Sequence, residues 1–261
     1  MKTTILLAIF SIAITTALFS QRATGGRSRS ESDYDPMAKP NLVKLNLTSL
    51  VLRNIALQYE RVLGNKISVA CGLRYMPKGS VPFKMPLDDI FNTGGELPDF
   101  PAWKVSSISI TPEFRFYPKH AGNGFYFAPY GRFRSMSLDI PIDYTDDNNK
   151  AQKINAVGTF NSYIGGIMIG SQFISGPIVT LDWFIVGFHY GVSNGKLDIK
   201  TSETLSVNDQ YELGTILYDF KQNTYSFRNI DYTINANGGS ISDKFKALGF
   251  RAFGLNLGIK F

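Results

Sequence analysis

From about residue 41 to its last residue, the chain alternates between hydrophobic and polar side chains at every second position. A period of two predicts β-strands with one apolar and one polar face, whereas amphipathic helices repeat every 3.6 residues. The first strand is an example, since Val43 and Leu45 oppose Lys44 and Asn46. We expect eight strands, at about residues 43–48, 55–60, 67–75, 107–116, 125–134, 164–174, 178–190 and 252–261.

The lengths of the connections indicate how these strands are arranged. Three connections are tight and contain turn-forming residues, at 64–65, 118–124 and 175–177. Apart from the short link at 50–53, the connections that alternate with them are long, at 77–102, 141–153 and 192–247. Short turns on one side and long loops on the other are typical of an antiparallel transmembrane β-barrel with both termini in the periplasm. We therefore predict an all-β fold, an antiparallel transmembrane barrel of eight strands.

The segment 192–247 is longer than a connection requires, and such loops are usually functional or disordered. Val207, Tyr211, Leu217 and Phe220 recur at roughly helical spacing and predict a short helix within a long extracellular loop. Residues 224–236 alternate like a strand, so a barrel of ten strands is the alternative. Together with 77–102, this segment forms either an external binding surface or a simple cap over the barrel.

The polar face of the strands carries many charges. A soluble sandwich or a lipocalin-like barrel also has alternating strands, but its apolar face fills the core and its charges point outward. An outer-membrane barrel has the reverse arrangement, with a polar lumen and an apolar surface. We expect a charge network in the lumen formed by Glu60, Arg74, Glu113, Arg115, Arg132, Arg134, Asp182 and Arg251, with Lys260 on the same face. An eight-stranded lumen is just wide enough for side chains, so these charges are expected to plug it, and a narrow ion path is the alternative.

The chain is rich in aromatic residues, with 20 Phe and 13 Tyr. Aromatic girdles flank the apolar band of membrane barrels at the two lipid–water interfaces. We expect one girdle near the short turns, formed by Tyr59, Phe116, Phe125, Phe127, Phe173 and Trp183.

The first twenty residues have the composition of a secretory signal peptide. Lys2 supplies the positive charge, and residues 5–19 form an apolar run too short to span a bilayer comfortably. An N-terminal membrane anchor is the alternative. We assign 1–20 to a signal peptide, 21–40 to a flexible mature N-terminus and 41–261 to the barrel domain. From this organisation we expect the protein in the outer membrane of a Gram-negative bacterium, with both termini in the periplasm.

Little in the composition points to catalysis or to a cofactor. The formal net charge of +6 comes from scattered Lys and Arg rather than from a basic patch, which argues against nucleic acid as a partner. One Cys and two His are too few for an internal disulfide or for most zinc sites, so we expect no cofactor and no metal. His189 and His120 are the candidates for a lipid hydrolase base, but neither has a recognisable nucleophile beside it. We therefore assign no catalytic residue and expect no enzyme.

The final strand ends in an alternating apolar pattern with an aromatic residue last. Leu255, Leu257, Ile259 and Phe261 resemble the terminal signal by which outer-membrane proteins are recognised for assembly. Two stretches, KLNLTSLVLRNIALQYERVLGNKISVACGLRY at 44–75 and GFYFAPYGRFR at 124–134, resemble an uncharacterised Gram-negative outer-membrane barrel family of the domain-of-unknown-function type. The resemblance implies a small OmpA/OmpX-like barrel without an assigned activity, with outer-membrane lipid and the barrel assembly machinery as partners.

Three classes of function are compatible with these patterns. The first is a structural or interaction protein that binds an extracellular ligand or an envelope protein through its outer loops. The second is a narrow, porin-like channel, and the third is an envelope lipid-modifying enzyme. The placement of the charged side chains distinguishes a plugged lumen from an open one.

Overall fold

The computed structural model describes residue 35 and residues 38–80, 103–145, 151–201, 203–222 and 228–261. The chain separates into two compact units, Met1–Asp35 and Pro36–Phe261, and the helices and strands named below all belong to the second. The expected signal peptide at 1–20, and most of the N-terminal segment at 21–40, lie outside the described residues.

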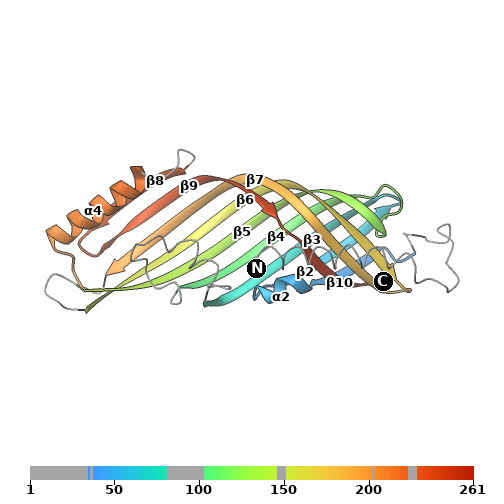
Figure 1. Cartoon of the computed structure of the whole chain (residues 1–261), viewed down its shortest axis with the longest axis horizontal. Helices are drawn as coiled ribbons and strands as arrows, with labels where there is room; N and C mark the ends of the chain where they lie inside the picture. The colour runs from blue at the N-terminus through green and yellow to red at the C-terminus, as the bar shows by residue number, and fades with distance from the viewer. Residues whose placement is uncertain (1–34, 36–37, 81–102, 146–150, 202, 223–227) are drawn as a thin grey trace, which may run out of the picture. The chain divides into compact units, whose positions relative to one another are not determined.

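The described residues of the second unit form one antiparallel sheet of ten strands (Figure 1). Its strands are β1 (Asn41–Asn46), β2 (Ile55–Gly64), β3 (Ile67–Ser80), β4 (Lys104–Phe116), β5 (Gly124–Thr145), β6 (Ala151–Ser175), β7 (Val179–Thr201), β8 (Arg228–Asn235), β9 (Gly238–Arg251) and β10 (Gly254–Lys260). Consecutive strands pair from β1 to β7, and β10 pairs with both β1 and β7. This double pairing of β10 closes the sheet into a ring.

The number of strands differs from the main prediction. The eight expected strands are all present as β1–β7 and β10, and these are the strands whose pairings close the ring. However, the segment 192–247 is not a long loop, since it contains the end of β7, a helix, β8 and most of β9. The outer half of β7 would otherwise have an unpaired edge, and β9 pairs with it from Gly187↔Arg251 to Lys200↔Gly238. The sheet therefore contains ten strands, as in the alternative prediction, while the ring itself is closed by the eight strands of the main prediction.

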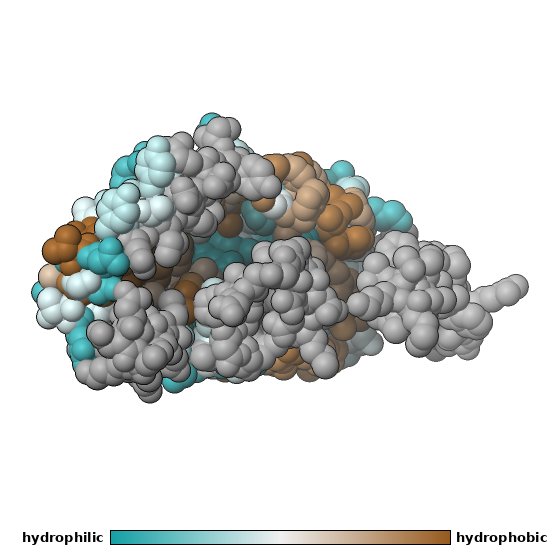
Figure 2. All heavy atoms as spheres, turned by 60° about the vertical axis from the view of Figure 1, so that its left-hand side comes forward, coloured by the Kyte–Doolittle hydropathy of each residue, from teal (hydrophilic) through white to brown (hydrophobic). Residues whose placement is uncertain are grey.

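Side chains alternate across the sheet as the sequence predicts, with apolar groups outside and polar groups inside the ring. In β2, for example, Leu57 is 49% exposed, whereas Glu60 is fully buried. In β4, Phe116 is 45% exposed and Arg115 is fully buried. Figure 2 shows hydrophobic outer surface beside a hydrophilic recess.

Two helices lie between strands in the part of the chain that the structure describes. The short helix α2 (Leu47–Val51) begins directly after β1, where the side chain of Asn46 accepts a hydrogen bond from Ser49 N and caps the helix. The helix α4 (Val207–Gln222) confirms the helix predicted from spacing, and Ser206 and Asp209 cap its first turn reciprocally. Among the described residues, no helix is long and apolar enough to cross a membrane.

At one level of the ring, the side chains of β7 and those of its partners β9 and β10 exchange their inward and outward directions. The register of β7 against β6 shifts between Ile169 and Gly170, so that Ile185 and Val186 are both exposed. Beside them, β10 ends and β9 takes over as the partner of β7, from Phe184↔Gly254 to Gly187↔Arg251. Because an extra residue in a strand reverses which face its side chains occupy, Arg251 and His189 point into the ring.

Candidate functional site

The interior of the ring holds a buried network of ion pairs centred on Arg115 of β4. Its guanidinium is fully buried and contacts carboxylates from three strands. Arg115 Nη1 lies 2.8 Å from Asp182 Oδ2 of β7 and 3.1 Å from Glu60 Oε2 of β2, and Nη2 lies 2.7 Å from Glu113 Oε2. One side chain therefore connects strands that are not neighbours in the sheet.

Lys44 of β1 is the second buried cation of this network. Its Nζ donates to Glu60 and lies 2.7 Å from Asp182 Oδ2, so it shares both carboxylates with Arg115. It also donates to the side-chain oxygen of Gln172 on β6. Ammonium and guanidinium groups buried this deeply are tolerated only when carboxylates and further acceptors surround them.

The charges of the network balance. Arg251 Nη1 lies 2.7 Å from Glu113 Oε1, which adds a third cation to Lys44 and Arg115. The three carboxylates of Glu60, Glu113 and Asp182 compensate these three positive charges. The network therefore carries no net charge, as a desolvated cluster requires.

Neutral side chains complete the hydrogen bonds of the carboxylates. Tyr126 Oη donates to Asp182 Oδ1 at 2.9 Å, and its ring lies 4.4 Å from the Arg115 guanidinium carbon. Tyr117, which follows the last residue of β4, donates to Glu60 Oε1 at 2.9 Å. Burial and the adjacent Glu60 carboxylate raise the pKa of the Tyr117 phenol well above its usual range, so this hydroxyl remains a donor. Gln58 Nε2 donates to Glu113 Oε2 at 2.9 Å.

Small residues make room for these large side chains. A Cβ added at Gly170 of β6 would overlap the ring of Tyr126, and a Cβ added at Gly254 of β10 would overlap the ring of Phe184. Gly170 and Gly254 therefore let the rings of Tyr126 and Phe184 approach the wall of the ring closely.

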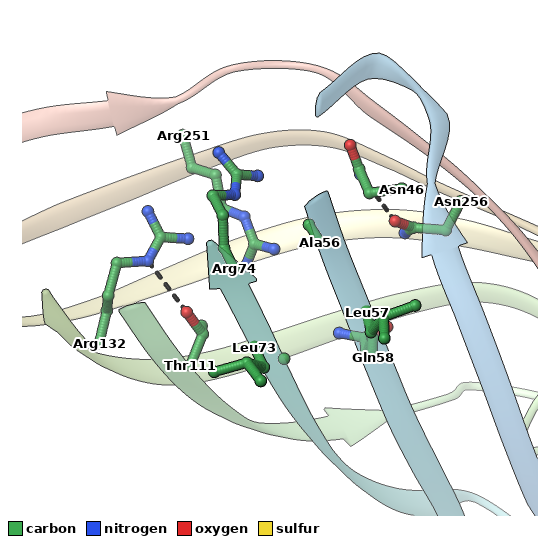
Figure 3. Close-up of a pocket in the computed structure, with 11 residues that line it drawn as sticks. Asn46, Ala56, Leu57, Gln58, Leu73, Arg74, Thr111, Arg132, Arg251 and Asn256 are labelled. Carbon is green, nitrogen blue, oxygen red and sulfur yellow. Dashed lines mark hydrogen bonds between the residues drawn. The ribbon is translucent and has the colours of Figure 1, made fainter. Parts of the chain in front are cut away.

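A second cluster of basic residues lies beside the network. Arg74 of β3, Arg132 of β5 and Arg251 line a cavity of about 30 Å³, with Thr111 accepting from Arg132 Nε at 3.0 Å (Figure 3). The charges of Arg251 and Arg134 act on Arg74, so these guanidinium groups repel each other. The ion-pair network is thus electrically neutral, whereas the cavity beside it is lined by basic side chains.

The structure brings together most of the predicted charge network, but it divides this set in two. Glu60, Glu113, Arg115, Asp182 and Arg251 are joined by ion pairs. Arg74, Arg132 and Arg134 form no ion pair with any carboxylate in the described part of the chain. Lys44, Gln58 and Gln172 were missed, although their polar positions in alternating strands could have indicated them.

The remaining predicted residues lie on the outer surface. Five of the six girdle aromatics are exposed there near the short turns: Tyr59, Phe116, Phe125, Phe127 and Phe173. Trp183 is only partly exposed and packs edge-on against Phe253, with ring centroids 5.6 Å apart. Leu257, Ile259 and Phe261 of the terminal pattern are exposed, and Leu255 is half-buried.

The two histidines lie in different environments. His189 points into the ring and its Nδ1 lies 3.0 Å from Tyr130 Oη. His120 lies in the turn between β4 and β5, where it forms an isolated bridge with Asn123. Within the described ranges, no group of three or more His, Cys, Asp and Glu side chains is arranged to hold a metal ion.

Comparison with known families identifies the chain. Residues 32–211 match the family described as "Protein of unknown function (DUF3575)". This match covers more than half of the sequence, so the protein belongs to that family. Searches of curated proteins and of solved structures found no match.

Proposed function

We propose that this protein is a small outer-membrane β-barrel of OmpA/OmpX-like type, whose lumen is plugged by charges and whose outer end serves a structural or interaction role. One observation carries the proposal, the reversed distribution of side chains in the ring. Apolar side chains such as Leu57 and Phe116 face outward, while Glu60, Arg115 and Asp182 are fully buried inside. In water this arrangement would expose a large apolar surface. In a bilayer, the apolar face contacts lipid and the polar face stays inside the ring.

The direction of the strands supports an orientation in the membrane. The turns after β2, β4 and β6 are short. They lie at the end of the ring where β1 begins and β10 ends. We assign this end, with both termini, to the periplasm. The opposite end carries α4, β8 and the outer part of β9, and it is the part available to an extracellular ligand or envelope protein (Figure 1).

The plug supports the interaction role over a porin-like channel. Lys44 and Arg115 share carboxylates from β2 and β7, so the ion pairs cross the interior instead of lining an open path along it. An enzymatic role has less support, because Nδ1 of the His189 ring contacts the phenol of Tyr130 rather than a serine or a carboxylate.

The cysteine Cys71 offers a direct test of the outward apolar face. It is a free thiol that lies exposed on β3, between Tyr59 of β2 and Pro112 of β4. In lipid nanodiscs, which are open on both sides, a water-soluble maleimide should label Cys71 only after the protein is unfolded in hot SDS. The hydrocarbon around this thiol excludes both the reagent and the thiolate.

The matched control is the variant C71S/K196C. Lys196 belongs to the outer part of β7 and its side chain is 65% exposed, so a cysteine there should react without denaturation. Labelling of native Cys71 in nanodiscs at the rate of this control would overturn the proposed membrane location.

A further inference from the structure

We propose that Arg74, Arg132 and Arg251 form a binding site for a phosphate group inside the ring, beside the ion-pair network. The ligand is either free phosphate or an amphiphile that carries a phosphate head group. This site goes beyond the proposed structural role, and it does not depend on where the barrel is located. Uncompensated charge, hydrogen-bond donors without acceptors and a route to the site support it.

The site has positive charge that the protein does not compensate. Arg251 uses one guanidinium nitrogen for Glu113, whose other oxygen is taken by Arg115. Neither Arg74 nor Arg132 forms an ion pair with a described carboxylate. The charge of Arg251 acts on both of them, and the more distant carboxylate of Glu113 acts on Arg132 alone. Holding like charges close together is unfavourable unless an anion lies between them.

The site also has hydrogen-bond donors without acceptors. Arg251 Nε is buried and has no hydrogen-bond partner in the described part of the chain. Arg132 donates to Thr111 through Nε, which leaves its terminal nitrogens available. The guanidinium of Arg74 makes no hydrogen bond to a described residue, and it lies beside that of Arg251 (Figure 3). Buried donors are nearly always satisfied, so Arg251 Nε points to a missing acceptor. Arg74 and Arg132, which are half-buried, offer further donors at the same cavity.

The chemistry of the donors selects the ligand. One guanidinium group can donate two parallel hydrogen bonds to two oxygens of a phosphate. Several guanidinium groups together compensate a doubly charged anion. The cavity of about 30 Å³ also receives the side chains of Asn46 and Asn256, which bond to each other at 2.7 Å. It is therefore a small polar chamber that admits an anionic group rather than a large apolar molecule.

Within the described strands, the pairing that forms the wall of the ring is interrupted next to this chamber. The pairing of β1 with β10 ends at Asn46↔Asn256, because β1 gives way to α2. Beyond this point, residues 246–251 of β9 pair only with β7 among the described strands. Apolar Leu50 and Val51 of α2 are exposed beside the interruption. A phosphate can thus arrive along the interior or, attached to an acyl chain, from the side.

The test is calorimetric titration of the full purified chain in a neutral maltoside detergent at constant 150 mM NaCl. One arm adds sodium phosphate and the other adds dihexanoyl phosphatidic acid. Dihexanoyl phosphatidylcholine, whose phosphate is a zwitterionic diester without net charge, is the lipid control. Binding of phosphate and phosphatidic acid supports a free-phosphate site, and binding of phosphatidic acid alone supports the lipid source. Absence of heat in both arms overturns the proposal.

Variants separate the site from unspecific attraction. R74Q/R132Q should weaken binding at least tenfold, whereas K196Q, which removes one exposed charge from β7, should leave it unchanged. R74K/R132K keeps both charges and should bind more weakly than the wild type but better than the glutamine variant, which excludes misfolding as the cause. Equal losses in K196Q and R74Q/R132Q would assign the binding to surface charge and overturn the proposal.

Discussion

Arg115 and Asp182 meet inside the ring, with Arg115 Nη1 2.8 Å from Asp182 Oδ2, although β4 and β7 are separated by β5 and β6 in the sheet. Backbone hydrogen bonds join each strand only to its neighbours. This ion pair instead connects strands across the interior, and Lys44 of β1 reaches the same carboxylate. The network therefore holds opposite sides of the ring together, while backbone hydrogen bonds hold neighbouring strands together.

Loss of one carboxylate should destabilise the ring strongly. Glu113→Ala leaves Arg115 and Arg251 without their shared partner, and an uncompensated buried charge costs about 3–5 kcal/mol. We expect a corresponding decrease in the free energy of unfolding in detergent, measured by urea titration of tryptophan fluorescence. The control Asp198→Ala breaks the exposed pair with Lys196 and should change nothing measurable. Equal free energies of unfolding for the two variants would contradict a stabilising role of the network.

The close approach of Gly170 to Tyr126 predicts a second, purely steric effect. A methyl group at Gly170 would overlap Tyr126 Oη and would lie 2.8 Å from the carbonyl oxygen of Trp183. Gly170→Ala should therefore displace the phenol from Asp182 and destabilise the protein by about 1–3 kcal/mol. Gly165→Ala is the matched control on the same strand, since no atom lies within 4 Å of its added Cβ. A thermal midpoint of Gly170→Ala equal to that of Gly165→Ala would contradict this packing.

The plug predicts the electrical behaviour of the lumen. In planar bilayers, the wild-type protein should show no steady single-channel current. The double variant Arg115→Ala/Asp182→Ala removes one cation and one anion together, so it empties part of the plug without changing the charge balance. It should conduct in discrete steps, provided that its gel mobility shows a folded ring. A steady current through the wild type would favour the narrow channel instead.

The terminal residue predicts a defect in assembly rather than in stability. The side chain of Phe261 is 53% exposed, so Phe261→Ala removes little packing. If the C-terminal pattern is an assembly signal, this variant should be depleted in the outer membrane and yet refold normally into detergent. Phe253→Ala, with a similarly exposed ring, is the control and should reach normal levels. Equal levels of the two variants would leave Phe261 without a role in recognition.

Local alternation predicted much of the fold and most of the interior charges. Glu60 and Glu113 were assigned to the correct face because the period of two is a property of neighbouring residues alone. Strict alternation back from Leu255 would place Arg251 outside, but both Ala252 and Phe253 are exposed and the face switches there. Such a switch depends on the partner strand, here β7 with its own irregularity at Ile185, and a single sequence does not encode it locally.

The outer segment illustrates the same limit. The helical spacing of Val207 and Leu217 was sufficient to predict α4. The pairing of β9 with β7 joins residues far apart in the sequence, from Lys200↔Gly238 to Gly187↔Arg251, and it could be predicted only as an alternative. The ion pairs themselves could be predicted as a set but not as partners, because Arg115 contacts residues from β2 and β7 that only the closed ring brings together.

The most direct test of the membrane barrel is the electrophoretic mobility of the protein from an outer-membrane fraction, with and without boiling in SDS. A closed barrel held by backbone hydrogen bonds between its strands and by an internal charge network resists the detergent and migrates as a compact species until it is heated. We predict recovery in the outer-membrane fraction and a clear shift on boiling. Recovery in the soluble periplasm, with identical mobility before and after boiling, would contradict the membrane barrel and its outward apolar face.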